Sequence, residues 1–133
     1  MRDVIDIAVK QPKAFRVDGK TFLLEFPLSA VIVLEAKLGR PMKGLSDWLK
    51  VSTGELWDVL EAGFRKHHEE ESHGIATALC DGLEPEDIER VIDAVCVCAC
   101  PRAMERLKEE MEKMRDRLKK GLPLPNVQSG AVS

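Results

Sequence analysis

Tyrosine is absent from this 133-residue sequence, and aromatic residues make up only 5% of it. Proteins that bind single-stranded nucleic acid stack its bases on aromatic side chains, and this sequence offers few side chains for such stacking. The formal net charge of −3 and the pI of about 5.7 give no general attraction to phosphate or to an anionic membrane surface. We therefore expect neither nucleic acid nor a membrane among the partners.

Long hydrophobic runs are also missing. No apolar stretch approaches the ~20 residues of a transmembrane helix. Acidic residues interrupt the first apolar segment, Met1-Arg-Asp-Val-Ile-Asp-Ile, where a signal peptide would need a continuous apolar core. The sequence predicts a protein that stays in the cytoplasm, where its four cysteines would be reduced.

Recognisable catalytic motifs are lacking. There is no Gly-x-Gly-x-x-Gly, P-loop or Gly-x-Ser-x-Gly pattern. The histidines His67, His68 and His73 do not have the spacing of His-Glu-x-x-His. We interpret them as surface residues of a solvated loop over residues 65–73. The sequence predicts no active site, no cofactor and no enzyme.

The four cysteines do not form a Cys-x-x-Cys pair. Cys96, Cys98 and Cys100 are spaced by two, and Cys80 lies upstream. Residues two apart on a helix point about 200° apart, so these thiols would not converge on one zinc ion. Buried reduced cysteine behaves as a small hydrophobic residue, which is the interpretation we favour. A metal-binding or thiol-redox protein remains a lesser alternative.

The sequence does contain a hairpin signal. Asp18-Gly19 suits a two-residue type I′ turn between two runs rich in β-branched and aromatic residues. The second strand is predicted over Lys20–Phe26, because Pro27 has no N–H to donate to a ladder. Residues 3–9 predict a further short strand or a short helix.

A helix follows the hairpin. Its apolar residues recur at helical spacing, and Gly39 ends it. These residues are Leu28, Val31, Leu34 and Leu38.

Two stretches carry a resemblance. "VDGKTFLLEFPLSAVIVLEAKLGRPM" and the later "ELWDVLEAGFRKHH" resemble the tail assembly chaperones of long-tailed bacteriophages and gene transfer agents. The matching residues are Asp18, Gly19, Lys20, Leu34, Glu35, Leu38 and Gly39. The resemblance covers about residues 14–95. It implies a non-catalytic protein that binds the tape-measure protein, keeps it soluble and helps to recruit tail-tube subunits.

Further helices are predicted downstream. One covers 44–51, with Leu45, Trp48 and Leu49 on one face. Ser52 and Glu55 fit a capping box that opens the next helix. The buried stripe of this next helix is predicted to be Leu56, Val59, Leu60, Gly63 and Phe64. Within it, Gly63 would let another part of the backbone approach closely.

The chain continues with a short helix over 74–80 and a longer one opened by Pro85. The inward stripe of the longer helix is predicted to be Ile88, Val91, Ile92, Val95, Cys96 and Ala99. Pro101 should end or kink this helix at Cys100, because proline disfavours the helical conformation at the residue before it.

The last helix carries the candidate binding site. Its apolar residues follow a 3-4-3-4 spacing on an otherwise charged helix, a narrow stripe that we call the seam. The seam consists of Met104, Leu107, Met111, Met114 and Leu118. Flexible, polarisable methionine is common on surfaces that accept varied partners. The seam could pack on its own domain, on a second copy of the chain or on a client protein.

We predict a mainly α (α+β) fold in three parts. Residues 1–100 form a small N-terminal β-hairpin packed on a compact helical domain, 101–120 form a long amphipathic helix, and 121–133 form a flexible tail. Function follows from the resemblance: a tail assembly chaperone with tape-measure and tail-tube partners. A self-associating structural module, as a dimer or ring, is the main alternative.

Overall fold

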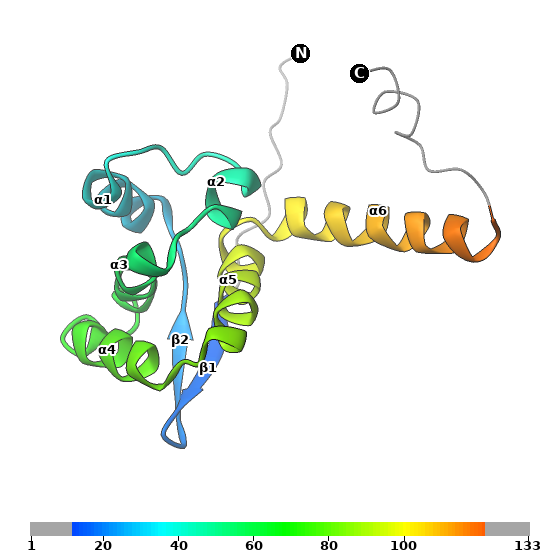
Figure 1. The fold of residues 1–133 in the computed structure, drawn as a ribbon. Coiled ribbons are helices and arrows are strands. Elements are labelled where there is room, and N and C mark those ends of the chain that lie inside the picture. The colour runs from blue at the N-terminus through cyan, green and yellow to red at the C-terminus, as the bar shows by residue number, and fades with distance from the viewer. Residues whose placement is uncertain (1–11, 122–133) are drawn as a thin grey trace, which may run out of the picture. The chain divides into compact units, whose positions relative to one another are not determined.

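The computed structural model describes residues 12–121, which form one antiparallel hairpin and six helices (Figure 1). In chain order these are β1 (Lys13–Val17), β2 (Lys20–Leu24), α1 (Leu28–Leu38), α2 (Leu45–Leu49), α3 (Thr53–Phe64), α4 (Ser72–Gly82), α5 (Pro85–Ala99) and α6 (Pro101–Lys119). The predicted mainly helical fold with a small hairpin packed on helices is confirmed. The segment predicted over 3–9 and most of the tail lie outside the described residues.

The chain divides into two compact units, Met1–Pro101 and Arg102–Ser133. The hairpin and helices α1 to α5 belong to the first unit, and α6 supplies the described helix of the second. Within residues 12–121, no helix combines the length and the apolar character needed to cross a membrane.

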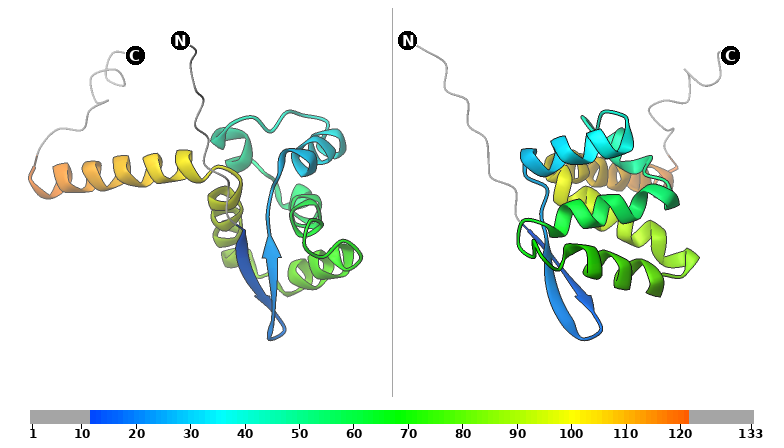
Figure 2. Two further views of the ribbon diagram at one scale, coloured as in Figure 1. Left: turned by 180° about the vertical axis from the view of Figure 1, so that it is seen from behind. Right: turned by 90° about the vertical axis from the view of Figure 1, so that its left-hand side faces the viewer.

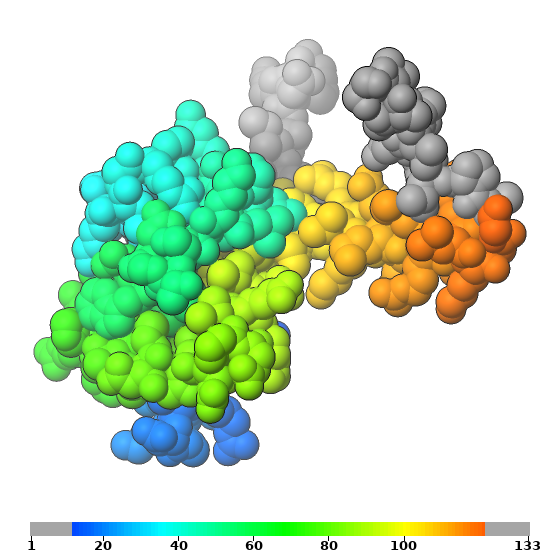
Figure 3. All heavy atoms as spheres, in the orientation of Figure 1, coloured from blue at the N-terminus to red at the C-terminus, as the bar shows by residue number. Residues whose placement is uncertain are grey.

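The hairpin turn has the predicted geometry. Asp18 has φ of 51° and Gly19 has φ of 79°, as a type I′ turn requires. The register pairs Val17 with Lys20 and Lys13 with Leu24. Figure 2 shows the two strands running together beside the helices, and in Figure 3 their tip extends beyond α4 and α5.

Strand β2 is shorter than the prediction, which extended it to Phe26. It ends at Leu24 because the next residue changes partner: the Glu25 N–H donates to the Gly63 carbonyl of α3 at 2.9 Å. Glu25 and Phe26 are buried after leaving the ladder. The backbone therefore stops pairing with β1 after Leu24 and pairs with α3 at the next residue.

Helix α3 lies at the centre of the first unit (Figure 1). The predicted capping box is present, since Ser52 Oγ accepts from the Glu55 N–H at 3.2 Å and a Glu55 carboxylate oxygen accepts from the Ser52 N–H at 3.0 Å. The whole predicted stripe of this helix is buried.

Gly63 is the point of closest approach, as predicted. A Cβ atom added there would lie 2.3 Å from Leu24 Cδ1 and 2.6 Å from Phe26 Cζ. Those distances are far below van der Waals contact, and both neighbouring side chains are fully buried. Only a residue without a side chain lets β2 and its extension pack against α3.

Several helix limits and faces differ from the prediction. Helix α4 begins earlier, at Ser72, and α2 is shorter. In α2, Trp48 is buried against Phe26 with ring centroids 4.9 Å apart, whereas Leu49 is exposed rather than inward. In α5, Ile88 and Ile92 are only half-buried. Predicted faces were thus most accurate where a helix is covered on several sides.

Candidate partner-binding surfaces

Helix α6 begins where the sequence predicts a break. Helix α5 ends at Ala99, Cys100 leaves the helical region with φ of −134° and ψ of 61°, and Pro101 starts α6. Proline suits a first helical position because its fixed φ is already helical and that N–H would lack a partner anyway. Gly121 follows the helix with φ of 73°. One continuous helix therefore carries the whole seam.

The structure divides the seam residues into two groups. Met104 is buried and Leu107 is half-buried. Met111, Met114 and Leu118 are exposed by 52%, 38% and 63%. Among described residues these are the large apolar side chains that α6 leaves exposed. We call these three residues the open seam.

A second exposed apolar surface lies on α1, and sequence reasoning missed it. Leu28 is 74% exposed and Ile32 is 58% exposed, one helical turn apart, with Val33 beside them at 37%. Val31 and Leu34 form the buried face of the same helix. The available signal was that the apolar residues of this helix occupy more than one face. We call Leu28, Ile32 and Val33 the α1 face.

A cavity of about 330 Å³ adjoins the α1 face. Pro27, Ala30, Val33 and Ala62 supply apolar lining, and Ser29, Arg65 and Lys66 supply polar lining. Figures 1 and 2 show α1 next to α3 on the outside of the first unit. The cavity extends the apolar surface of α1 towards two cations at the end of α3.

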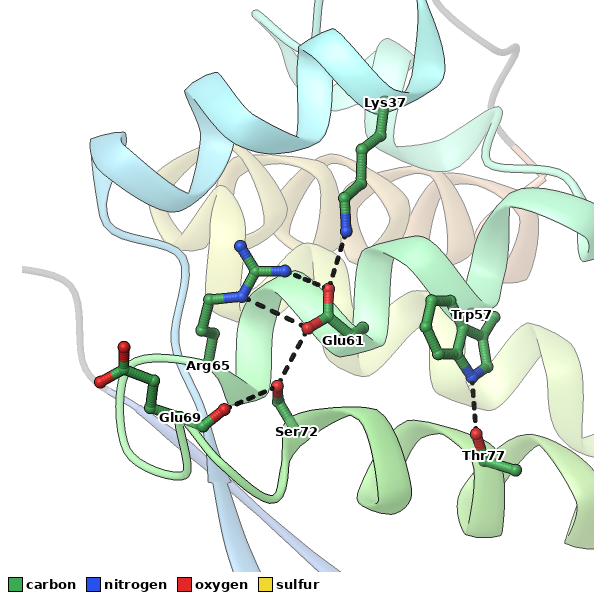
Figure 4. A network of polar contacts seen from close by, with 7 residues as sticks. All are labelled: Lys37, Trp57, Glu61, Arg65, Glu69, Ser72 and Thr77. Carbon is green, nitrogen blue, oxygen red and sulfur yellow. Dashed lines mark hydrogen bonds and ion pairs between the residues drawn. The ribbon is translucent and has the colours of Figure 1, made fainter.

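The carboxylate of Glu61 is buried within α3 and holds three partners (Figure 4). Lys37 Nζ donates to Oε1 at 3.0 Å, Ser72 Oγ–H donates to Oε2 at 2.9 Å, and Arg65 donates from two guanidinium nitrogens. Burial would raise the pKa of Glu61, but the hydrogen bonds from Lys37, Arg65 and Ser72 outweigh it and lower the pKa. The carboxylate therefore stays charged and ties α1, α3 and α4 together.

Glu25 is a second buried carboxylate. Lys66 Nζ donates to Oε2 at 2.7 Å, and His67 Nε2 lies 2.8 Å from Oε1. These hydrogen bonds, that of Lys66 first, lower the pKa of Glu25. The predicted solvated loop over 65–73 is largely confirmed, since residues 65–71 form turns and most of them are exposed. The prediction did not include the role of this segment as the source of cationic partners for the buried acids Glu25 and Glu61.

His67 and His73 are exposed, as predicted, and His68 is half-buried, but all three histidines also make defined contacts. His68 Nε2 accepts the backbone N–H of Leu23 at 3.0 Å, and its ring packs edge-on to Phe22. The His73 ring packs edge-on to Trp57, whose indole N–H donates to Thr77 Oγ1 at 3.0 Å (Figure 4). These contacts fasten α4 and the preceding loop to β2 and α3.

Two cysteines behave as core residues. Cys96 and Cys98 are both buried, and the Cys98 thiol donates to the Leu24 carbonyl at 3.0 Å. Burial raises the pKa of Cys96 to about 12, so its reactive thiolate is scarce at neutral pH. In the part of the chain that the structure describes, no three His, Cys, Asp or Glu side chains gather as a metal site would require.

Comparison with protein families, with curated proteins and with solved structures found no match. The resemblance to tail assembly chaperones therefore remains a prediction carried by the residues themselves. The open seam and the α1 face are the surfaces from which a function can be argued.

Proposed function

We propose that the chain is a non-catalytic tail assembly chaperone that binds its tape-measure protein through the open seam and helps to recruit tail-tube subunits. One observation carries the choice of site. Met111, Met114 and Leu118 form an exposed apolar stripe on an otherwise charged helix. Burying one such side chain contributes roughly 1.5–3 kcal/mol, so a partner that covers the stripe would gain substantially.

The charges beside the open seam give the client a chemical character. At about 100° per residue, Lys108, Arg115 and Lys119 border the seam on one side. Glu110 and Arg117 border it on the other side, and Glu109 and Asp116 fall on the opposite face of the helix, so cations outnumber acids beside the seam. We therefore expect the client to supply an apolar stripe with acidic neighbours, and to bind more weakly as salt screens these charges.

A co-expression pull-down tests the proposal. The tagged chain is produced with candidate tape-measure and tail-tube proteins from its own gene neighbourhood, and the soluble fraction of each candidate is measured. We expect the tape-measure protein to become soluble and to co-purify. We also expect Met111→Asp to reduce its recovery, because a charge in the middle of the seam would have to be buried without a partner.

Lys113→Asp is the matched control. It introduces the same aspartate on the same helix, but away from the seam. Its recovery of the client should stay near that of the unaltered chain. Equal loss in both variants, or no binding by any neighbouring gene product, would contradict the proposal.

Self-association is the second candidate, and the same open seam favours it. Two seams could cover each other in a dimer, or successive copies could close a ring. Light scattering on the full chain and on a chain ending at Cys100 distinguishes these states. A seam-mediated oligomer should revert to the mass of one chain on truncation, whereas equal subunit numbers would remove the seam from that role.

A further inference from the structure

The α1 face offers an apolar surface that the core does not use. Leu28 and Ile32 are exposed although Val31 and Leu34 of the same helix are buried, and the cavity beside Val33 continues the apolar surface towards α3. Monomeric proteins rarely expose contiguous apolar patches without a binding role. Because the patch extends beyond the cavity, a protein segment fits it better than a small molecule would.

Positive charge surrounds one end of this surface. Arg65 and Lys66 line the cavity, and their side chains are 36% and 48% exposed. The carboxylates that they hold, Glu61 and Glu25, are buried beneath them. In both ion pairs the cation is the exposed member and the carboxylate is the buried one, so the charged groups that a partner can reach at this end of the surface are cationic.

The N-terminus of α1 adds to this field. Its N-cap residue is Pro27, no side chain caps the helix, and its first turn holds no acidic residue. A helix N-terminus favours negative charge because its first N–H groups lack intrahelical partners. The N-cap Pro27 and the first-turn residue Ser29 also line the cavity. Two cations and a helix N-terminus therefore converge on one place.

We propose that the α1 face and its cavity dock an acidic amphipathic segment of a partner protein. The apolar side chains of that segment cover Leu28, Ile32 and Val33, and one of its carboxylates lies at the N-terminus of α1 beside Arg65 and Lys66. A second copy of the chain paired through the same face would bring like cations together, so charge complementarity favours a different protein. This site is separate from the open seam and does not depend on it.

Fluorescence anisotropy of a labelled, designed peptide tests the proposal on the full chain. The peptide of about 15 residues forms an amphipathic helix with leucines on one face and glutamates at its borders. Its counterpart carries lysine in place of each glutamate. We expect saturable binding of the glutamate peptide and, for the lysine peptide, affinity lower by about tenfold or more, which is 1.4 kcal/mol or more.

Ser29→Asp separates binding from stability. An aspartate in the first turn of α1 favours the helix, so the fold should be unharmed while the partner's carboxylate is repelled. We expect Ser29→Asp and Ile32→Ser each to weaken glutamate-peptide binding about fivefold or more. Ser46→Asp is the matched control, because Ser46 is also an exposed serine in the first turn of a helix, α2. Its binding should be unchanged.

Three results would overturn the proposal: no saturable binding of the glutamate peptide, binding that Ser29→Asp and Ile32→Ser leave intact, or binding lost only in Met111→Ser. The last result would assign the peptide to the open seam instead. The proposed chaperone function is judged by tape-measure recovery, which Met111→Asp changes, so the two proposals can fail independently.

Discussion

Helices α3 and α6 make opposite use of their apolar residues. In α3 every residue from Val59 to Phe64 is buried, including the charged Glu61. In α6 the apolar residues keep a regular spacing, yet Met104 alone is buried. Periodicity is therefore evidence that a helix has an apolar face, but it does not say whether the chain itself covers that face.

Interactions with other elements account for the difference. Helix α3 packs on α1, α4, α5 and β2, and Gly63 lets the extension of β2 come within hydrogen-bonding distance. The open-seam residues of α6, by contrast, are exposed. Equal substitutions should therefore cost stability in α3 and cost little in the open seam.

Leucine truncation should give the largest contrast. Leu60 is fully buried in α3, and Leu118 is 63% exposed in α6. We expect Leu60→Ala to lower the free energy of unfolding by about 2–5 kcal/mol, because it removes apolar contacts and leaves a cavity. Leu118→Ala should change it by less than about 0.5 kcal/mol. Urea denaturation followed by circular dichroism measures both, and a similar loss in the two variants would refute the comparison.

Glycine replacement should give the next largest effect. Gly63→Ala places a methyl group 2.3 Å from Leu24 Cδ1, and we expect it to lower the free energy of unfolding by about 1–3 kcal/mol despite the better helix propensity of alanine. Gly54→Ala is the control, since a Cβ atom added there would lie 4.0 Å from Ser52 Oγ, an ordinary van der Waals distance. Its thermal midpoint should be equal or slightly higher. A stable Gly63→Ala variant would mean that β2 can withdraw from α3.

Local sequence signals predicted much of the fold. Asp18-Gly19 identified the turn, Ser52 and Glu55 identified the start of α3, and Gly39 identified the end of α1. Each of these depends on neighbouring residues and on backbone preferences that tertiary packing rarely overrides. Gly63 was also predictable, because glycine inside an apolar stripe indicates close approach.

Non-local contacts were the part that sequence could not supply. Residues 65–73 look polar and loop-like, but Lys66 and His67 hold Glu25 from more than forty positions earlier in the chain. A local pattern cannot show which distant acid becomes buried. For the same reason the α1 face was missed: helical spacing placed Leu28 with the core residues, while packing left it outside.

Replacing a lysine should give a smaller difference in the free energy of unfolding between the first unit and α6. Lys66→Ala leaves the buried carboxylate of Glu25 with one partner fewer, and we expect a loss of about 1–2 kcal/mol in the free energy of unfolding. Lys113→Ala on exposed α6 should cost less than about 0.5 kcal/mol. Thermal denaturation of both variants at neutral pH measures the difference. No loss on removing Lys66 would mean that His67 alone compensates Glu25.

Acid should weaken the first unit through carboxylates that the fold keeps charged. The pKa of Glu55 is lowered from 4.5 to about 2, chiefly by hydrogen bonds from Arg40 at 2.9 and 3.1 Å and from the Ser52 N–H. Because the folded chain binds this proton less readily than the unfolded chain, the stabilisation is complete above pH 4.5 and is lost as the pH falls towards 2. Glu25 and Glu61 shift in the same direction.

Glu55→Gln tests this titration, since glutamine keeps a capping oxygen but cannot ionise. The variant should be less stable than the unaltered chain at pH 7 and should lose less stability between pH 4.5 and pH 2. Glu112→Gln on exposed α6 should retain the full acid sensitivity of the unaltered chain. If both variants kept the same slope, the Arg40–Glu55 pair would not contribute to stability, and the acid response would have to come from Glu25 and Glu61.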